Sequence, residues 1–175
     1  DNPKSTTIKV SFLSNAKQIE ALLPPGFTLH GDPVVTVSAT YMKEIEWLAG
    51  RGYNVLGVTI PARFSGQNDQ AVGPFLTVLW ENLADPIITG REELGFSKIY
   101  CELPEIRISG NSASSSASWL GFNFLDINVD DLKPRREPAA GPKVDGQLHY
   151  KYMPRTGEWG TADVEYAVLT PAEGS

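Results

Sequence analysis

The sequence contains a single cysteine, Cys101, among its 175 residues, so no disulfide can form within the chain. Proteins of reducing compartments use few disulfides, and this scarcity favours an intracellular, cytoplasmic setting. Histidine is equally scarce, because His30 and His149 are the only two and no Cys/His cluster has the spacing of a metal site. The chain also lacks a phosphate-binding loop, a dinucleotide fingerprint and a G-x-S-x-G nucleophile elbow. We therefore expect no bound metal and no cofactor.

Excess positive charge and long apolar runs are lacking as well. The formal net charge is -6, whereas a nucleic acid or an anionic membrane surface would require a basic face. No apolar run approaches the ~20 residues that cross a bilayer. We expect neither a nucleic acid nor a membrane as partner. With 41% hydrophobic and 21% charged residues, the chain suits one globular domain over residues 1–175.

Strand-forming patterns, in contrast, are abundant. Alternating or β-branched runs predict about eight strands, at residues 7–13, 33–42, 53–64, 74–81, 98–108, 115–129, 145–153 and 161–169. Pro61 implies an edge, a bulge or a strand end in its run. Because helices do not alternate regularly with these strands, a doubly wound parallel sheet is disfavoured. We predict a mainly β (α+β) fold, an antiparallel barrel-like curved sheet with a few short helices and a central cavity for one small ligand.

Two short helices are expected. A cap at Ser14 or Asn15 begins the first, which the following prolines stop. The second would run from Thr89 to Gly95, because Thr89 and Glu92 have the spacing of a capping box and Gly95 is placed to end a helix.

Two further segments have biased composition. The run SASSSAS, residues 112–118, reads either as low-complexity sequence or as a strand face of small residues. The segment 130–143 is rich in proline and charge, which predicts an exposed loop.

Lys98 stands at the start of an apolar strand, where a neutral lysine amine could do covalent chemistry. Such an amine attacks a ketone or aldehyde to form a Schiff base, and the protonated imine draws electrons from a neighbouring bond. A lysine amine has a pKa near 10.4 in water, and burial in an apolar pocket lowers such a pKa by up to ~3–5 units. Phe96, Ile99 and Tyr100 are neighbours that could supply the pocket. A solvated surface lysine is the commoner case, and both interpretations stay open on these residues alone.

The run DPIITGREELGFSKIY, residues 85–100, resembles the signature of the acetoacetate decarboxylase family. That signature reads as an apolar segment, Gly-Arg-Glu, two residues and Gly/Ala-Phe-Pro-Lys-Lys. The matching residues, in order and spacing, are Gly90, Arg91, Glu92, Gly95, Phe96 and Lys98. The resemblance extends loosely over most of residues 7–170. It implies the fold of the family, a homo-oligomer, and Lys98 as the Schiff-base nucleophile.

The sequence departs from the family at several positions. Ile99 replaces the second lysine, the cation that lowers the pKa of the nucleophile in the family. The acidic residue of the middle strand falls on Val55, a second acidic position falls near Ser38, and the expected arginine falls near Ser5. These losses argue against acetoacetate as substrate and for a larger, less polar carbonyl compound, such as a specialised metabolite. The family chain continues beyond Ser175, so this chain is a short member or lacks a tail.

Other side chains are candidates for the same pocket. Glu81 would be a general base if its strand turns it inward. Arg91 is expected in a structural ion pair, although it could reach a substrate anion, and Tyr53 matches a family tyrosine that lines the pocket or packs. Tyr100 lies two residues after Lys98 and should share its strand face, which makes its hydroxyl a candidate donor.

The sequence therefore predicts a carbon–carbon lyase that acts on a carbonyl small molecule through Lys98, by decarboxylation or by aldol or dehydration chemistry. One alternative is an enzyme of the same fold that cyclises or isomerises its substrate without an imine. Another is a non-catalytic small-molecule binder.

Overall fold

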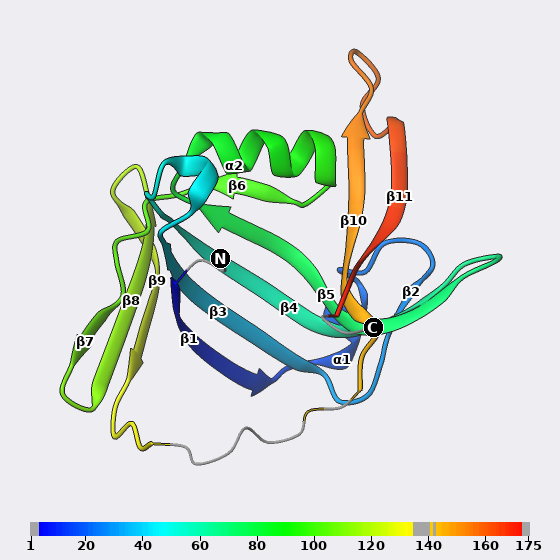
Figure 1. Ribbon diagram of the computed structural model, residues 1–175. Helices are drawn as coiled ribbons and strands as arrows, with labels where there is room; N and C mark the ends of the chain where they lie inside the picture. Colours follow the sequence, from blue (N-terminus) through cyan, green and yellow to red (C-terminus); the bar gives the residue numbers. More distant parts are fainter. Residues whose placement is uncertain (1–3, 135–140, 142, 173–175) are drawn as a thin grey trace.

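The computed structural model describes residues 4–134, 141 and 143–172, which form two β-sheets and a few short helices (Figure 1). The strands of the large sheet are β1 (Lys4–Leu13), β2 (Phe27–Leu29), β3 (Val34–Lys43), β4 (Tyr53–Ser65), β5 (Gln70–Glu81), β6 (Lys98–Tyr100), β10 (Gly146–Pro154) and β11 (Ala162–Pro171). The small sheet contains β7 (Arg107–Ser109), β8 (Ser112–Trp119) and β9 (Phe122–Val129). The helices are α1 (Ala16–Glu20), the 3-10 turn η1 (Glu46–Leu48), α2 (Ala84–Thr89) and its π-helical continuation η2 (Gly90–Leu94).

The large sheet is curved but not closed, and its main path runs β1-β3-β4-β5-β10-β11. The mainly β, barrel-like sheet predicted from the sequence is confirmed in this open form. Two neighbours of β5 are parallel to it, namely β6 and β10, so the sheet is mixed and not purely antiparallel. Parallel neighbours require a crossover connection, and α2 with η2 supplies it between β5 and β6. In Figure 1 this helical segment lies alongside β6.

The strand count differs from the prediction, because the described residues form eleven strands. The predicted strand 98–108 is divided into β6 and β7, and the predicted strand 115–129 is the β8–β9 hairpin. Leu120 and Gly121 form its two-residue turn, and both have positive φ, which matches the twist of a hairpin. The run 112–118 is therefore a strand of small residues. The predicted loop 130–143 lies partly outside the described residues, and Asp130–Pro134 has no regular structure.

The predicted helix over residues 89–95 is wrong in its start. Helix α2 begins at Ala84, and Thr89 lies inside it, where the hydroxyl donates to the Asp85 carbonyl. Pro86 is tolerated because the first-turn N–H groups of a helix have no partner within the helix. Gly95, with φ of 80°, ends the segment as predicted. The cap of α1 is also confirmed, since the Asn15 side chain accepts from the Gln18 N–H.

Pro61 lies where β4 changes its neighbour. Strand β3 pairs with β4 as far as Thr59, and β2 pairs with it from Ala62 onward. A register shift between Val58 and Thr59 adds a bulge on the β5 side. The missing N–H of Pro61 therefore costs no regular ladder bond, which confirms the sequence expectation.

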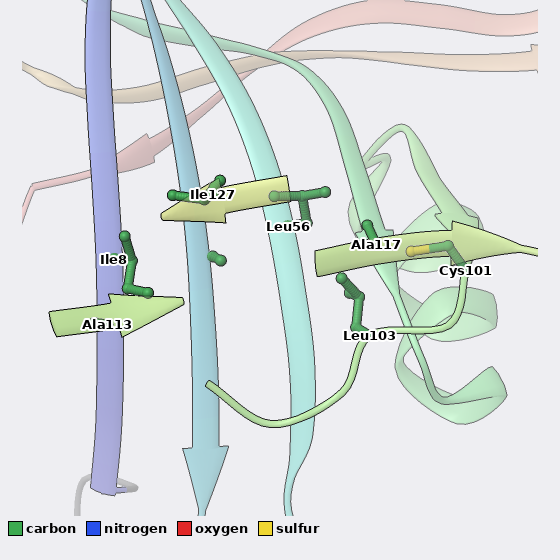
Figure 2. Packing of buried hydrophobic residues seen from close by; sticks show 8 residues of the cluster. Ile8, Leu56, Cys101, Leu103, Ala113, Ala117 and Ile127 are labelled. Atoms are coloured by element: carbon green, nitrogen blue, oxygen red, sulfur yellow. The ribbon is translucent and has the colours of Figure 1, made fainter. Parts of the chain in front are cut away.

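The two faces of the large sheet have different surroundings. One face, here called the packed face, carries Ile8, Ala39 and Leu56, which pack against side chains of the small sheet such as Ala117 and Ile127 (Figure 2). A second cluster, with Phe27, Ile60, Phe75 and Leu148 among its members, covers the other end of the strands with α1, β2 and β10. The opposite face carries the candidate site. No helix in the described part of the chain is long and apolar enough to span a membrane.

Candidate active site

Lys98 and Glu81 form a buried ion pair. Strands β5 and β6 run in parallel with Lys98 beside Leu79 and Tyr100 beside Glu81. The Lys98 Nζ atom lies 2.9 Å from Glu81 Oε1, and the two side chains are 8% and 1% exposed. Glu81 thus has the inward orientation that a general base acting with Lys98 requires. Ion pairs with so little exposure are scarce, because each charge loses its hydration.

The face that carries this pair, here called the site face, follows from strand alternation and register. Val55 lies opposite Glu81 in the sheet, and Gly57 lies opposite Leu79. Alternation places Tyr53 on the same face as Val55 and Gly57. A side chain on Gly57 would contact Leu79 Cδ1 at 3.2 Å, which agrees with this assignment.

Helix α2 and η2 cover the amine of Lys98. Its Nζ donates a hydrogen bond of 2.9 Å to the Pro86 carbonyl. A Cβ atom at Gly90 would lie 2.5–2.6 Å from Lys98 Cδ, Cε and Nζ. The Phe96 ring lies with its centroid 5.6 Å from the same Nζ. The lysine therefore occupies space that any residue larger than glycine at position 90 would take.

Two side chains of strand β10 make polar contacts with the end of the helical cover, the segment α2–η2 that lies over Lys98. Lys151 Nζ donates to the carbonyls of Glu92, at 2.7 Å, and Glu93, at 3.2 Å. His149 Nε2 lies 3.0 Å from the Leu94 carbonyl. The last carbonyls of a helix have no partner within the helix, and a cation near them is favourable. These two β10 side chains hold the helical segment in place, and the sequence indicates no such role for either, because no local pattern connects β10 with η2.

Charge and burial shift the pKa of two groups on the site face. Burial raises the pKa of the Glu81 carboxyl, and the ion pair with Lys98 opposes this rise. Burial, together with the negative charge of Glu81, raises the pKa of Tyr53 to about 12. The Tyr53 hydroxyl therefore stays protonated at neutral pH and can act as a hydrogen-bond donor near Glu81.

Arg91 holds the backbone of β6. Its Nη1 atom donates a hydrogen bond of 2.9 Å to the carbonyl of Lys98. An acidic partner at ion-pair distance, expected for Arg91, is not found within the described part of the chain. A planar guanidinium suits this role, because its donors are fixed in direction.

A sequence model of the acetoacetate decarboxylase family matches residues 1–174. The chain belongs to the acetoacetate decarboxylase family. A comparison with curated protein sequences gives no match.

Solved structures of the acetoacetate decarboxylase type have the same fold. The acetoacetate decarboxylase of Legionella pneumophila superimposes with a TM-score of 0.73 at 18% identity, over 97% of this chain and 64% of that one. An acetoacetate decarboxylase-like enzyme of Sphingomonas wittichii gives 0.74 at 15% identity, over 97% and 71%. The enduracididine biosynthesis enzyme MppR, complexed with the condensation product of pyruvate and imidazole 4-carboxaldehyde, gives 0.71 at 14% identity, over 87% and 63%. This chain thus spans less than two thirds of the length of MppR and of the Legionella enzyme.

Two residues expected to surround the Lys98 amine, Ile99 and Tyr100, line a different pocket. Tyr100 is 46% exposed although it lies two residues after Lys98, because β6 ends at Tyr100 and no further strand covers it. Ile99 is 52% exposed and lies on the opposite side of β6 from Lys98. Both line a shallow apolar pocket of about 310 Å³, together with Trp80, Trp119, Phe122 and Phe124. The apolar character of Ile99 therefore says nothing about the surroundings of the amine.

His149 gives this acetoacetate decarboxylase family member a dependence of stability on pH. Its ring stacks on Phe96 with centroids 4.0 Å apart, and the side chain is 1% exposed. Burial lowers the pKa of His149 below its ordinary value of 6.5. As pH falls below 6.5, the unfolded chain binds a proton that the folded chain resists, so the free energy of unfolding decreases.

We expect His149→Phe to flatten this dependence between about pH 7 and pH 5, because the ring still stacks but no longer titrates. At neutral pH the variant should lose about 1 kcal/mol with the hydrogen bond to Leu94. Urea unfolding across this pH range measures both effects. His30→Phe, at an exposed position, is the control, and an unchanged slope in His149→Phe would contradict the assignment.

Proposed function

We propose that this protein is a lyase that acts on a carbonyl small molecule, with Lys98 as the Schiff-base nucleophile and Glu81 as its proton acceptor. The observation that carries the proposal is the buried pair of Lys98 Nζ and Glu81 Oε1, 2.9 Å apart. A lysine must lose its proton before it attacks a carbonyl, and the buried carboxylate is the nearest described group that can take it. A buried carboxyl whose pKa is shifted by desolvation and by a charged partner, as for Glu81, is a candidate for a catalytic site.

The proposed reaction begins with attack of the neutral Lys98 amine on the substrate carbonyl carbon. Loss of water from the adduct gives a protonated imine. In a β-keto acid, the bond to the carboxylate then breaks, carbon dioxide leaves, and the bonding electrons neutralise the imine nitrogen to give an enamine. Protonation at carbon and hydrolysis of the imine release the ketone and regenerate the amine. Cleavage or dehydration of an aldol adduct would use the same imine.

Several observations support a carbonyl substrate. The family is named for a decarboxylase of a β-keto acid, and the MppR structure holds a product of pyruvate and an aldehyde. The Tyr53 hydroxyl and Glu81 supply a donor and an acid/base group on the site face. We infer in addition, from the family resemblance, that the protein assembles as a homo-oligomer, which sedimentation would test.

Borohydride trapping tests the proposal directly. The protein is reduced in the presence of a panel of β-keto acids, ketones and aldehydes, and its intact mass is measured. We expect an adduct that maps to Lys98 and is absent in Lys98→Ala. Lys9→Ala is the matched control. Lys9 is an exposed lysine of β1, and its partner in the sheet, Ser38, lies opposite Gly57, so Lys9 belongs to the same site face as Lys98. Folded protein without an adduct across the panel would contradict the imine.

A second candidate function rests on the partners of the amine. Glu81, the Pro86 carbonyl and the helical cover already surround Lys98, an arrangement that also suits a lysine whose charge orients a substrate. The protein would then cyclise or isomerise its substrate without an imine, or bind it without reaction. A cyclase would turn over and resist trapping, whereas a binder would only be stabilised by its ligand.

A further inference from the structure

A cavity of about 600 Å³ lies toward the other end of β4 and β5 from the Lys98 pair. Six side chains that line it come from neighbouring strands: Val34, Thr36, Thr59, Pro61, Val72 and Pro74. The volume lies within the range of small-molecule sites. Neither Lys98 nor Glu81 lines it, so the single central cavity expected around the lysine is replaced by a separate one.

Register and alternation place this cavity on the site face. Along β4, Val55, Gly57, Thr59 and Pro61 alternate onto one side. Thr59 pairs with Thr36 of β3, and Pro61 pairs with Pro74 of β5, and these residues line the cavity. The cavity and the side chains of the Lys98–Glu81 pair therefore lie on the same side of the sheet.

The walls of the cavity are chemically apolar. The Thr36 hydroxyl is already bonded to Ser11, at 2.8 Å between the two oxygen atoms. The titratable side chains that border it, His30, Asp32 and Lys143, are exposed to solvent. No buried charge is thus available in the described lining to bind an anion, and the chemistry fits an uncharged apolar chain.

Two leucines of β5 lie between the cavity and the pair, and Leu76 is buried. Leu76 and Leu79 lie over Gly57, where a Cβ would be 3.5 and 3.2 Å from their Cδ1 atoms. Leu76 pairs with Thr59 at the cavity, and Leu79 pairs with Lys98. Glu81 lies five positions beyond Leu76 on β5, a separation of roughly 16 Å in a strand.

We propose that this cavity binds the apolar tail of the carbonyl substrate, whose carbonyl carbon reacts at Lys98. The inference rests on the proposed function and names its substrate class: an extended ketone or β-keto acid with a long apolar chain on the side away from the reacting bond. A short polar keto acid leaves the cavity and the two leucines unused.

A chain-length series of methyl ketones tests the inference. Borohydride trapping on Lys98 is compared for acetone, 2-heptanone and 2-pentadecanone at equal concentration, because only the last has an alkyl chain long enough to span roughly 16 Å from the reacting carbonyl to the cavity. We expect at least about a tenfold rise in trapping from acetone to 2-pentadecanone, because each buried methylene favours binding. Val34→Trp and Thr59→Trp fill the cavity and should abolish the rise while acetone still reacts. Thr170→Trp, at an exposed position of β11, is the control. Measurable trapping that is equal for all three ketones, or a rise that persists in both filled variants, would overturn the inference.

A calorimetric titration with 2-pentadecanone separates this inference from the imine chemistry. Binding that is lost in Thr59→Trp, without trapping of any ketone, supports the cavity as the apolar-chain site and contradicts Lys98 as nucleophile. Binding that survives in Thr59→Trp but is lost in Trp119→Ala places the ligand on the exposed aromatic pocket and overturns the inference. Absence of binding by the folded wild-type protein overturns it as well.

Discussion

Lys98→Met is expected to lower the free energy of unfolding by about 3–5 kcal/mol at neutral pH, because it leaves the Glu81 carboxylate buried without its cation. The Glu81 side chain is 1% exposed, and its Oε2 atom has no hydrogen-bond partner in the described part of the chain. Water therefore does not replace the lost ammonium. Chemical denaturation at neutral pH measures the loss.

The stability that Lys98→Met loses should depend on pH. Burial raises the pKa of Glu81 and Lys98 opposes the rise, so removal of Lys98 raises that pKa further. The folded variant then keeps a proton that the unfolded chain releases near pH 4.5, and its stability falls as pH rises through the raised pKa. We expect Lys98→Met to be more stable at about pH 5 than at about pH 8.

The double variant Lys98→Met/Glu81→Leu is the matched control. It removes both charges and keeps two apolar side chains of similar size, so most of the lost stability should return and the pH slope should vanish. A double variant as unstable as Lys98→Met would show that the loss comes from packing and not from the unpaired carboxylate.

Gly90→Ala is expected to destabilise the protein by about 2–4 kcal/mol, although the same change in an ordinary helix stabilises by about 1 kcal/mol. The backbone at Gly90 is helical, with φ of -64° and ψ of -37°, so alanine meets no strain there. The new Cβ would instead lie 2.6 Å from Lys98 Nζ and displace the amine from Glu81. Thermal and urea unfolding measure the change, and imine trapping should decrease in parallel.

In a Lys98→Ala background, Gly90→Ala is expected to have the opposite effect on the free energy of unfolding. The shorter side chain vacates the space beside position 90, so alanine there should be neutral or stabilise by up to about 1 kcal/mol. Equal destabilisation by Gly90→Ala in both backgrounds would show that the clash lies elsewhere in the helical cover.

The sequence predicted the parts of this fold that depend on local pattern. Alternation located most of the strands, and Gly95 ended the helical segment where expected, because each depends on a few adjacent residues. The predicted start of α2 is wrong, because Thr89 and Glu92 have the spacing of a capping box although the helix begins at Ala84. The two parallel neighbours of β5 could not be predicted, because parallel pairing joins segments far apart in the chain.

The candidate site likewise combines residues that the sequence indicates with contacts that only the folded structure shows. The signature located Lys98 and Gly90, but the orientation of Glu81 needed the register between β5 and β6. Tyr100 shows the limit of the alternation rule, because a strand of three residues does not continue far enough to bury its last side chain. His149 and Lys151 could not be found from the sequence, since their contacts depend on how β10 docks beside η2.

The late position of β10 in the chain affects how the site is made during synthesis. His149 follows its partner Leu94 by 55 positions, and Lys151 comes later still. Chains grow from the N-terminus at about 5–20 residues per second, so β5, α2 and β6 leave the ribosome some seconds before the strand that fastens them. During that interval the helix over Lys98 has no anchor on β10. A nascent chain that stalled before residue 149 would therefore hold Lys98 under an unsecured helix, and the candidate site is completed only when the β10–β11 hairpin docks.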